Sequence, residues 1–171
     1  MVLPINEQVG VAPYADLRVS RKVCTAAEWA TGADFNIFQI TGGPIIIEYM
    51  FGHVTTLMGA GAATPGFQHT PDVAIYIGTG QVDINLAAAD ISTDVVDTLY
   101  IWDGLNGDQL APTTKVGICD TTEYAWTGAG GGIILVEGMI NVDNGTAINA
   151  GVIDVYMLWR PQRSPAQVIA Q

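Results

Sequence analysis

The fold of this chain is decided by residues 34–58, whose sequence is DFNIFQITGGPIIIEYMFGHVTTLM. Residues 35–40 are aromatic and β-branched, which favours a pleated strand with one buried face. The Gly-Gly-Pro sequence at 42–44 predicts a tight turn, because glycine adopts positive φ freely and proline fixes its own φ. Residues 45–57 then predict a long strand, so the whole stretch is interpreted as a hairpin.

The long strand at 45–57 is apolar on both of its faces and carries only Glu48 and His53 as titratable side chains. Strict alternation gives one face as Ile45, Ile47, Tyr49 and Phe51, and the other as Ile46, Met50 and Val54. A strand that is apolar on both faces is enclosed in a core or lies in a subunit interface.

Short apolar segments separated by turn residues continue through the rest of the chain. We expect strands at 19–29 (with a short helix there as the alternative), 73–77, 81–89, 95–102, 115–120, 123–126, 133–142 and 151–160. Asp143-Asn-Gly-Thr predicts a hairpin turn between the last two of them. The small residues of 59–71 and 128–132 predict loops. His69 falls in the first of these loops, so it is expected to be solvated.

Many short strands at regular spacing are typical of a β-sandwich or barrel. We predict an all-β, single-domain antiparallel sandwich of jelly-roll type at 18–161. An extended N-terminal arm is predicted at 1–17. The tail at 162–171 is expected to be a loose extension or a short helix.

The composition describes an apolar, acidic protein of one-domain size. Hydrophobic residues make up 49% of the 171 residues and charged residues 13%, against about 25% charged residues in ordinary soluble domains. The apolar surplus is therefore expected at contacts between subunits. The sequence has neither a long apolar run nor a secretory signal, so no membrane partner is expected. Cys24 and Cys119 are expected to be buried thiols, with a disulfide as the alternative.

The net charge of -11 argues against nucleic acid as a partner, because such binding needs basic residues to neutralise phosphates. Five of the six basic residues lie near the two ends of the chain: Arg18, Arg21, Lys22, Arg160 and Arg163. Two interpretations remain open. These residues are solubilising terminal charges, or they form a basic surface that docks onto an acidic partner.

Motifs for catalysis or cofactor binding are absent from the sequence. His53 and His69 form neither HxH nor HExxH, and no serine lies in GxSxG. The aspartates lie mostly in predicted turns, where local hydrogen bonding explains them. Cysteine–histidine chemistry stays open as an alternative. The tryptophans and tyrosines are expected in the core and at subunit contacts, with a sugar-binding platform as the alternative. We therefore expect no catalytic residue, metal or cofactor.

Several segments resemble a pattern found in head decoration (cement) proteins of tailed bacteriophages. The first is Phe38-Gln-Ile-Thr-Gly-Gly-Pro-Ile-Ile-Ile, followed by Gly52-His-Val-Thr-Thr. Further pieces are Leu86-Ala-Ala-Ala-Asp-Ile-Ser leading into Asp97-Thr-Leu-Tyr-Ile, and a closing strand at 152–161 that ends in Trp159-Arg-Pro. These scattered motifs cover residues 35–161 and mark strands and turns.

The resemblance implies a non-enzymatic virion protein, made in the host bacterial cytoplasm, that binds the outer capsid surface. As a trimer it would clamp neighbouring subunits of the major capsid protein. An outer position also suits an acidic body, which packaged DNA would repel. We assign capsid contacts to the five terminal basic residues. Core or trimer contacts are assigned to Ile45, Ile47, Tyr49, Phe51, Ile134, Val136 and Trp159. The alternatives are a tail or fibre protein that binds host glycans, and a carbohydrate-active enzyme.

Overall fold

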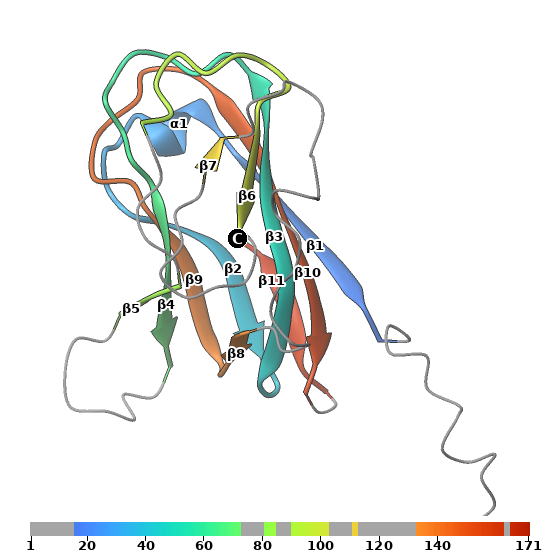
Figure 1. The fold of residues 1–171 in the computed structure, drawn as a ribbon. Helices are drawn as coiled ribbons and strands as arrows, with labels where there is room; N and C mark the ends of the chain where they lie inside the picture. Colours follow the sequence, from blue (N-terminus) through green and yellow to red (C-terminus); the bar gives the residue numbers. More distant parts are fainter. Residues whose placement is uncertain (1–15, 73–80, 85–89, 103–110, 113–132, 163–164) are drawn as a thin grey trace, which may run out of the picture.

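Two antiparallel sheets pack face to face in the computed structural model, which describes residues 16–72, 81–84, 90–102, 111–112, 133–162 and 165–171 (Figure 1). Sheet A contains, in spatial order, β1 (Arg18–Cys24), β10 (Val152–Pro161), β3 (Ile45–Thr56), β6 (Leu99–Trp102) and β7 (Ala111–Pro112), with β8 (Ile133–Leu135) also pairing with β3. Sheet B contains β11 (Gln167–Ala170), β2 (Phe35–Thr41), β9 (Gly138–Asp143), β4 (Gly66–Pro71) and β5 (Val82–Asp83). A single turn of helix, α1 (Ala26–Trp29), follows β1.

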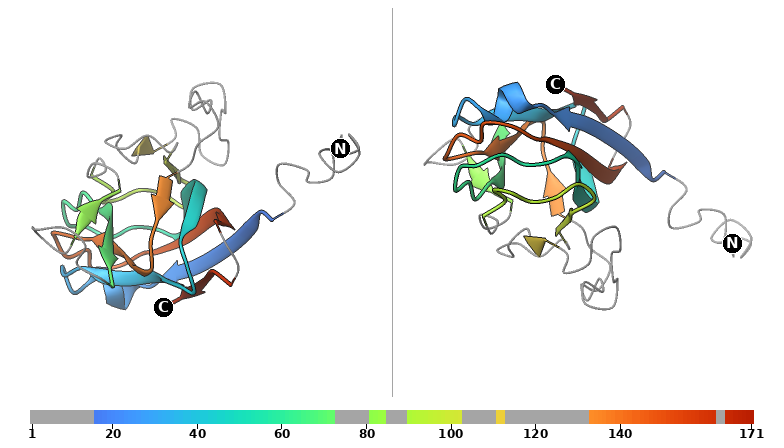
Figure 2. Two further views of the ribbon diagram at one scale, coloured as in Figure 1. Left: turned by 90° about the horizontal axis from the view of Figure 1, so that it is seen from below. Right: turned by 90° about the horizontal axis from the view of Figure 1, so that it is seen from above.

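The connections between the strands are those of a jelly roll. Sheet A contains four neighbouring strands in the order β1, β10, β3 and β6, and sheet B contains four in the order β2, β9, β4 and β5. The two layers can be followed from either end of the sandwich in Figure 2. Consecutive strands therefore fall mostly in opposite sheets, as in double-sheet jelly rolls. The prediction of an all-β antiparallel sandwich is confirmed.

Both predicted hairpins are wrong, because their strands lie in different sheets. β2 belongs to sheet B and β3 to sheet A, and β9 and β10 are separated in the same way. The turn residues themselves were identified correctly: Gly42 and Gly43 have φ of 74° and 135°. A Cβ on Gly42 would lie 2.8 Å from the carbonyl oxygen of Pro165, so glycine is needed for packing as well as for φ. The chain reverses there, but it crosses from one layer to the other.

The strand predicted at 133–142 is two strands. β8 pairs with β3 in sheet A, whereas β9 pairs with β2 and β4 in sheet B. The chain changes sheets around Val136 and Glu137, where Gly138 adopts a φ of 151°. A continuous apolar pattern did not reveal this break, because residues on both sides of it are buried in the same core.

Other boundaries also differ from the predictions. The segment 59–71, expected to be a loop, contains β4, and the tail contains β11, which pairs with β2. The first predicted strand ends at Cys24 and is followed by α1, the alternative kept for that segment. The strand predicted at 95–102 begins only at Leu99. The strands predicted at 73–77, 115–120 and 123–126, and most of the arm, lie outside the described residues.

The ladder between β3 and β10 forms the centre of sheet A and contains a register shift. Leu158 pairs with Tyr49, but Trp159 pairs with Ile47, so Glu48 is an extra residue on β3. Such a bulge reverses the side-chain alternation beyond it. Ile45 and Ile47 are therefore buried with Met50 and Val54, whereas Tyr49 and Phe51 point outward. The predicted face containing all four of Ile45, Ile47, Tyr49 and Phe51 is wrong.

Replacing Gly138 with alanine tests the sheet-changing bend. A Cβ at this position would lie 2.2 Å from the carbonyl oxygen of Thr70, so the backbone must move. We expect Gly138→Ala to lower the free energy of unfolding by about 3 kcal/mol. Gly145→Ala is the matched control, because Gly145 also has positive φ but has open space around it; its cost is about 1 kcal/mol. Urea denaturation measures both, and equal losses would contradict the steric argument.

Candidate interaction surface

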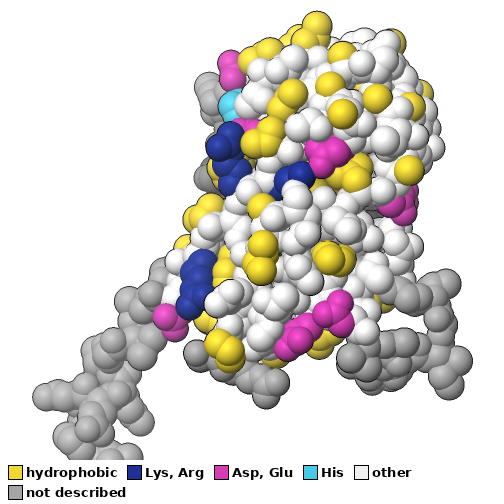
Figure 3. Space-filling model, turned by 180° about the vertical axis from the view of Figure 1, so that it is seen from behind, with side chains coloured by type: hydrophobic (Ala, Val, Ile, Leu, Met, Phe, Trp, Pro, Cys, Tyr) yellow, Lys and Arg dark blue, Asp and Glu magenta, His cyan; other side chains and the backbone are white. Residues whose placement is uncertain are grey.

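The pairing of β1 with β10 brings together the basic residues from the two ends of the chain. Arg18 lies opposite Trp159 and Arg21 lies opposite Tyr156. Within the described part of the chain, every Lys and Arg lies on these two strands, and Figure 3 shows basic side chains along this side of the molecule. The structure therefore places Arg18, Arg21, Lys22 and Arg160 on two paired strands, and their contact with a capsid stays a prediction. Arg163 lies outside the described residues.

Each of these four basic side chains has a partner within the chain. Arg21 forms an ion pair with Asp154 at 2.5 Å, and this hydrogen bond raises the pKa of Arg21. Arg160 pairs with Glu48, and Lys22 pairs with Glu28 at 2.7 Å. Arg18 donates a hydrogen bond to the carbonyl oxygen of Ala166 at 3.3 Å and lies over the Trp159 ring. The group is therefore largely neutralised by its own neighbours.

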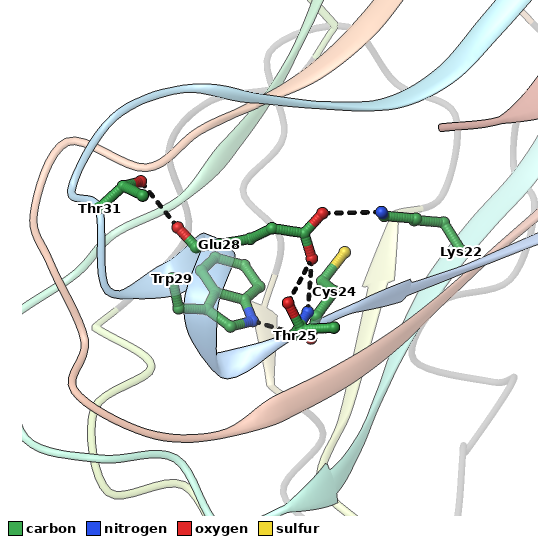
Figure 4. Close-up of polar contacts among 6 residues, drawn as sticks. All are labelled: Lys22, Cys24, Thr25, Glu28, Trp29 and Thr31. Carbon is green, nitrogen blue, oxygen red and sulfur yellow. Dashed lines mark hydrogen bonds and ion pairs between the residues drawn. The ribbon is translucent and has the colours of Figure 1, made fainter.

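The polar cluster around α1 is a helix cap (Figure 4). The amide and hydroxyl of Thr25 donate to the Glu28 carboxylate at 2.6 and 2.9 Å. Burial works against ionisation of Glu28, but its bonds with Lys22 and Thr25 outweigh burial and lower its pKa. The Trp29 indole donates to the carbonyl oxygen of Cys24 at 3.2 Å. These contacts fix the end of β1, since they satisfy donors that a helix start leaves free.

Cys24 is a free and fully buried thiol, as predicted. Burial raises its pKa to about 12. The thiolate is the nucleophilic form of cysteine, so this side chain is chemically inert at neutral pH. The burial and the raised pKa of Cys24 disfavour cysteine–histidine chemistry at this residue. Cys119 lies outside the described residues.

The outward side chains of β1, β10, β3 and β8 form an apolar and aromatic surface, which we call the sheet A outer face. Phe51 stacks on Tyr156 with ring centroids 4.7 Å apart, and Tyr49 lies 6.0 Å from Phe51. The guanidinium carbon of Arg21 lies over the Tyr156 ring, 5.8 Å from its centroid. At the margins, Val19 is 63% exposed and Ile134 is 55% exposed.

The residues predicted as core or oligomer contacts divide into two groups. Ile45, Ile47 and Trp159 are buried between the sheets and cannot reach another subunit. The Trp159 indole is satisfied by the Ser20 hydroxyl at 3.0 Å. The other four residues reach the surface: Tyr49, Phe51, Ile134 and Val136. The bulge at Glu48 is what separates the two groups on β3.

The outer face of sheet B is polar and acidic, which the sequence analysis missed. Gln68 donates hydrogen bonds to Asp83 at 3.1 Å and to Asp143 at 3.3 Å. Burial, followed by the charge of Asp34 and its hydrogen bond, raises the pKa of Asp143. Across the ranges that the structure describes, no group of three His, Cys, Asp or Glu side chains could hold a metal ion. The signal that was available is the alternation of Gln68 and Thr70 with Phe67 and His69 in a segment interpreted as a loop.

The two histidines have opposite environments. His53 lies on the outer face of sheet A, and its Nε2 is 3.0 Å from Asp97. His69 was expected to be solvated, but it is only 4% exposed on β4, so that prediction is wrong. Its Nδ1 donates to the carbonyl oxygen of Met139 at 3.1 Å, whereas its buried Nε2 has no partner. Burial lowers the pKa of His69 against the opposing effects of Met139 and Asp72.

A small apolar cavity of about 30 Å³ lies between the sheets. Its lining includes Trp29, Gly52, Phe67, Tyr100 and Val142. A space of this size has room for about two water molecules, so it is a packing void and cannot hold a sugar. In the described ranges, no helix is long and apolar enough to cross a membrane.

The ion pair of Arg21 and Asp154 yields a stability prediction. Asp154 is 5% exposed, so Arg21→Ala leaves a buried carboxylate without its basic partner. We expect this substitution to lower the free energy of unfolding. Adding Asp154→Asn should recover at least half of that loss, because it removes the unpaired charge. Urea denaturation of the double-mutant cycle measures the coupling, with Arg18→Ala as the control; strictly additive effects would refute it.

The lowered pKa of His69 predicts a pH dependence of stability. Below about pH 6.5 the unfolded chain binds a proton that the folded chain refuses, so stability falls as the pH falls through that value. His69→Gln should remove this part of the dependence, and His53→Gln, at the exposed site, should keep it. Urea midpoints at pH 7.5 and pH 5.5 provide the measurement. An equal loss in the wild type and in His69→Gln would show that His69 is not responsible.

The comparisons with known proteins identified no relative of this chain. No protein-family model, no curated protein and no solved structure matches the chain. The function is therefore argued from the chain's own residues and surfaces.

Proposed function

We propose that this chain is a structural protein of a tailed-phage virion that binds the outer capsid surface and stabilises it by clamping neighbouring capsid subunits. In this proposal it acts as a homo-oligomer, with a trimer as the expected form. The observation that carries the proposal is the sequence resemblance to head decoration proteins. Among the described residues its motifs fall on β2, β3, β6 and β10, and residues 86–89 of one motif lie outside the described ranges.

The fold is compatible with this role without deciding it. Jelly rolls occur in viral capsid proteins, lectins and cupins, so the architecture alone does not select a function. The acidic character of the chain supports a position outside the shell. A net charge of -11 opposes contact with packaged DNA, because DNA binding requires basic residues that are free to neutralise phosphates. Here the described basic residues are already paired with acidic side chains or a backbone carbonyl.

The segments proposed to contact the capsid join the strands β1 and β10 at one end of the sandwich, and the tail then pairs with β2 as β11. Arg18, at the start of β1, lies opposite Trp159, close to the end of β10. The segments 1–17 and 162–171 therefore begin next to each other in space. This placement supports their acting together on one partner. The pairing of Arg21 and Arg160 with carboxylates leaves less basic surface for an acidic partner than the sequence suggested.

A second candidate function is glycan binding by a tail or fibre protein. The observation in its favour is the outward aromatic group of Tyr49, Phe51 and Tyr156, since aromatic rings offer flat apolar surface with a polar tip. Trp29 and Trp159, by contrast, are buried and cannot form such a platform. Among the described residues, no specific observation favours the carbohydrate-active enzyme.

Co-sedimentation of the full chain with undecorated phage heads tests the proposed function. We expect saturable binding and an increase in the melting temperature of the heads. A chain lacking residues 1–17 should remain folded and lose binding, because it lacks the arm. Heads that are already decorated serve as the control for specific binding.

A folded chain that fails to bind heads would contradict the capsid proposal. Calorimetric titration with host saccharides then tests the second candidate. Tyr156→Ala should abolish any saccharide binding that depends on the aromatic group.

A further inference from the structure

We propose that the sheet A outer face is the surface through which this chain associates with a second copy of itself. The inference rests on the proposed function in one respect, because it names the contact surface of the proposed homo-oligomer. It does not require that the capsid is the partner. It assigns self-association to one face of the jelly roll and leaves the opposite face free.

The strand register arranges the apolar side chains of this face in continuous rows. Val19, Leu158 and Tyr49 lie side by side across β1, β10 and β3. Ile46 and Ile134 extend the apolar surface across β3 and β8. The stack of Phe51 on Tyr156 follows on the other side of the row that contains Val19, Leu158 and Tyr49, and it adds flat aromatic area to the face. Aromatic residues are enriched at the centres of protein interfaces.

The two arginines of this face are neutralised by acidic neighbours, and Asp97 lies beside His53 at 3.0 Å. Arg21 is 53% exposed at its side chain, but it is held by Asp154 at 2.5 Å. Arg160 is held by Glu48 in the same way. Both arginines among the described residues of this face are thus committed to carboxylates, which gives an acidic partner little to bind, and a basic partner would be drawn to the opposite face. An equivalent face on a second copy avoids both mismatches.

The distribution of acidic residues favours contact through sheet A. Asp34, Asp83 and Asp143 gather on the outer face of sheet B, and no salt bridge joins them to a basic residue in the described ranges. Stacked sheets lie about 10 Å apart, so two copies joined through sheet A hold these carboxylates about 30 Å apart. That separation exceeds the Debye length of about 8 Å at physiological salt. Contact through sheet B would instead bring the carboxylates together.

The dimensions of the face also suit a stable contact. β1, β10, β3 and β8 have 7, 10, 12 and 3 residues, and at about 3.3 Å per residue and 5 Å between strands they give a projected area on the order of 500 Å². Standard interfaces bury about 800 Å² of accessible surface on each partner, so the face can supply the larger part of such a contact.

Association through the strand edge is disfavoured. β1 is the edge strand of sheet A, and its inward side chains include the charged Arg18 and Lys22. Inward-pointing charges are one way in which proteins block edge pairing. Arg18 also ties this edge to Ala166, just before β11. These features disfavour pairing through the β1 edge, which adjoins the sheet A outer face.

Sedimentation equilibrium of the full chain tests this inference through paired charge insertions. Val19→Glu with Ile134→Glu places two carboxylates on the sheet A outer face at positions that are more than half exposed. Val82→Glu with Ile169→Glu is the matched control, because it adds the same charge at exposed positions of sheet B. Circular dichroism and the melting temperature verify that both variants are folded.

We expect the wild type to sediment above the chain mass of 18.1 kDa. The sheet A variant should weaken association at least about tenfold, a difference that is readily measured, and the control should associate like the wild type. A wild type that stays monomeric at every concentration, or a folded sheet A variant that associates normally, would overturn the inference. Dissociation of the control alone would also overturn it.

The head-binding assay separates this inference from the proposed function. A wild type that associates through sheet A but does not bind heads leaves the inference standing and removes the capsid role. If the wild type binds heads and the sheet A variant keeps its full oligomeric mass, the capsid role stands and the inference about sheet A is removed.

Discussion

The ladder between β3 and β10 is the constraint on which both the core and the surface depend. Its inner side chains close the apolar core, and its outer side chains form the aromatic group. The extra residue at Glu48 determines which side chains of β3 point into the core and which point to the outer face. Without that bulge, Tyr49 and Phe51 would point into the core and Met50 would point outward. The same bulge lets Glu48 meet Arg160 on the outer face, so one local irregularity sets packing, charge pairing and surface chemistry together.

The strands and turns could be predicted from sequence more readily than their partners. Alternating apolar residues and the glycines at 42–43 mark strands and a reversal, because these signals depend on local backbone geometry. Whether a reversal stays in one sheet depends on contacts distant in sequence, such as Gly42 against Pro165 and Asn144 on the carbonyl oxygen of Trp29 at 3.0 Å. A jelly roll places most consecutive strands in opposite layers, whereas a hairpin keeps them in one sheet. The prediction of a jelly roll therefore conflicted with the prediction of two hairpins.

The surface was predictable only in part, because its charge pairs also depend on contacts between residues distant in sequence. The clustering of Arg18, Arg21, Lys22 and Arg160 followed from two terminal strands that happen to pair. The neutralisation of these basic residues could not be predicted, because Glu28, Glu48 and Asp154 approach them only in the tertiary fold. His69 shows the converse error. It lies in a segment rich in small residues and was expected in solvent, yet β4 turns it inward beside Met139.

The two faces of the sandwich differ in chemistry, and this difference limits how the chain can act. Sheet A presents apolar and aromatic side chains with internally paired charges, whereas sheet B presents amides and carboxylates that form no salt bridge with a basic residue in the described part of the chain. Coulomb repulsion among copies of an acidic chain is smallest when the neutral faces meet. An assembly built in this way displays the sheet B faces outward. A partner that reaches those faces must then supply basic groups or hydrogen-bond donors, whereas a partner that meets the terminal segments at the end of β1 and β10 avoids the acidic surface.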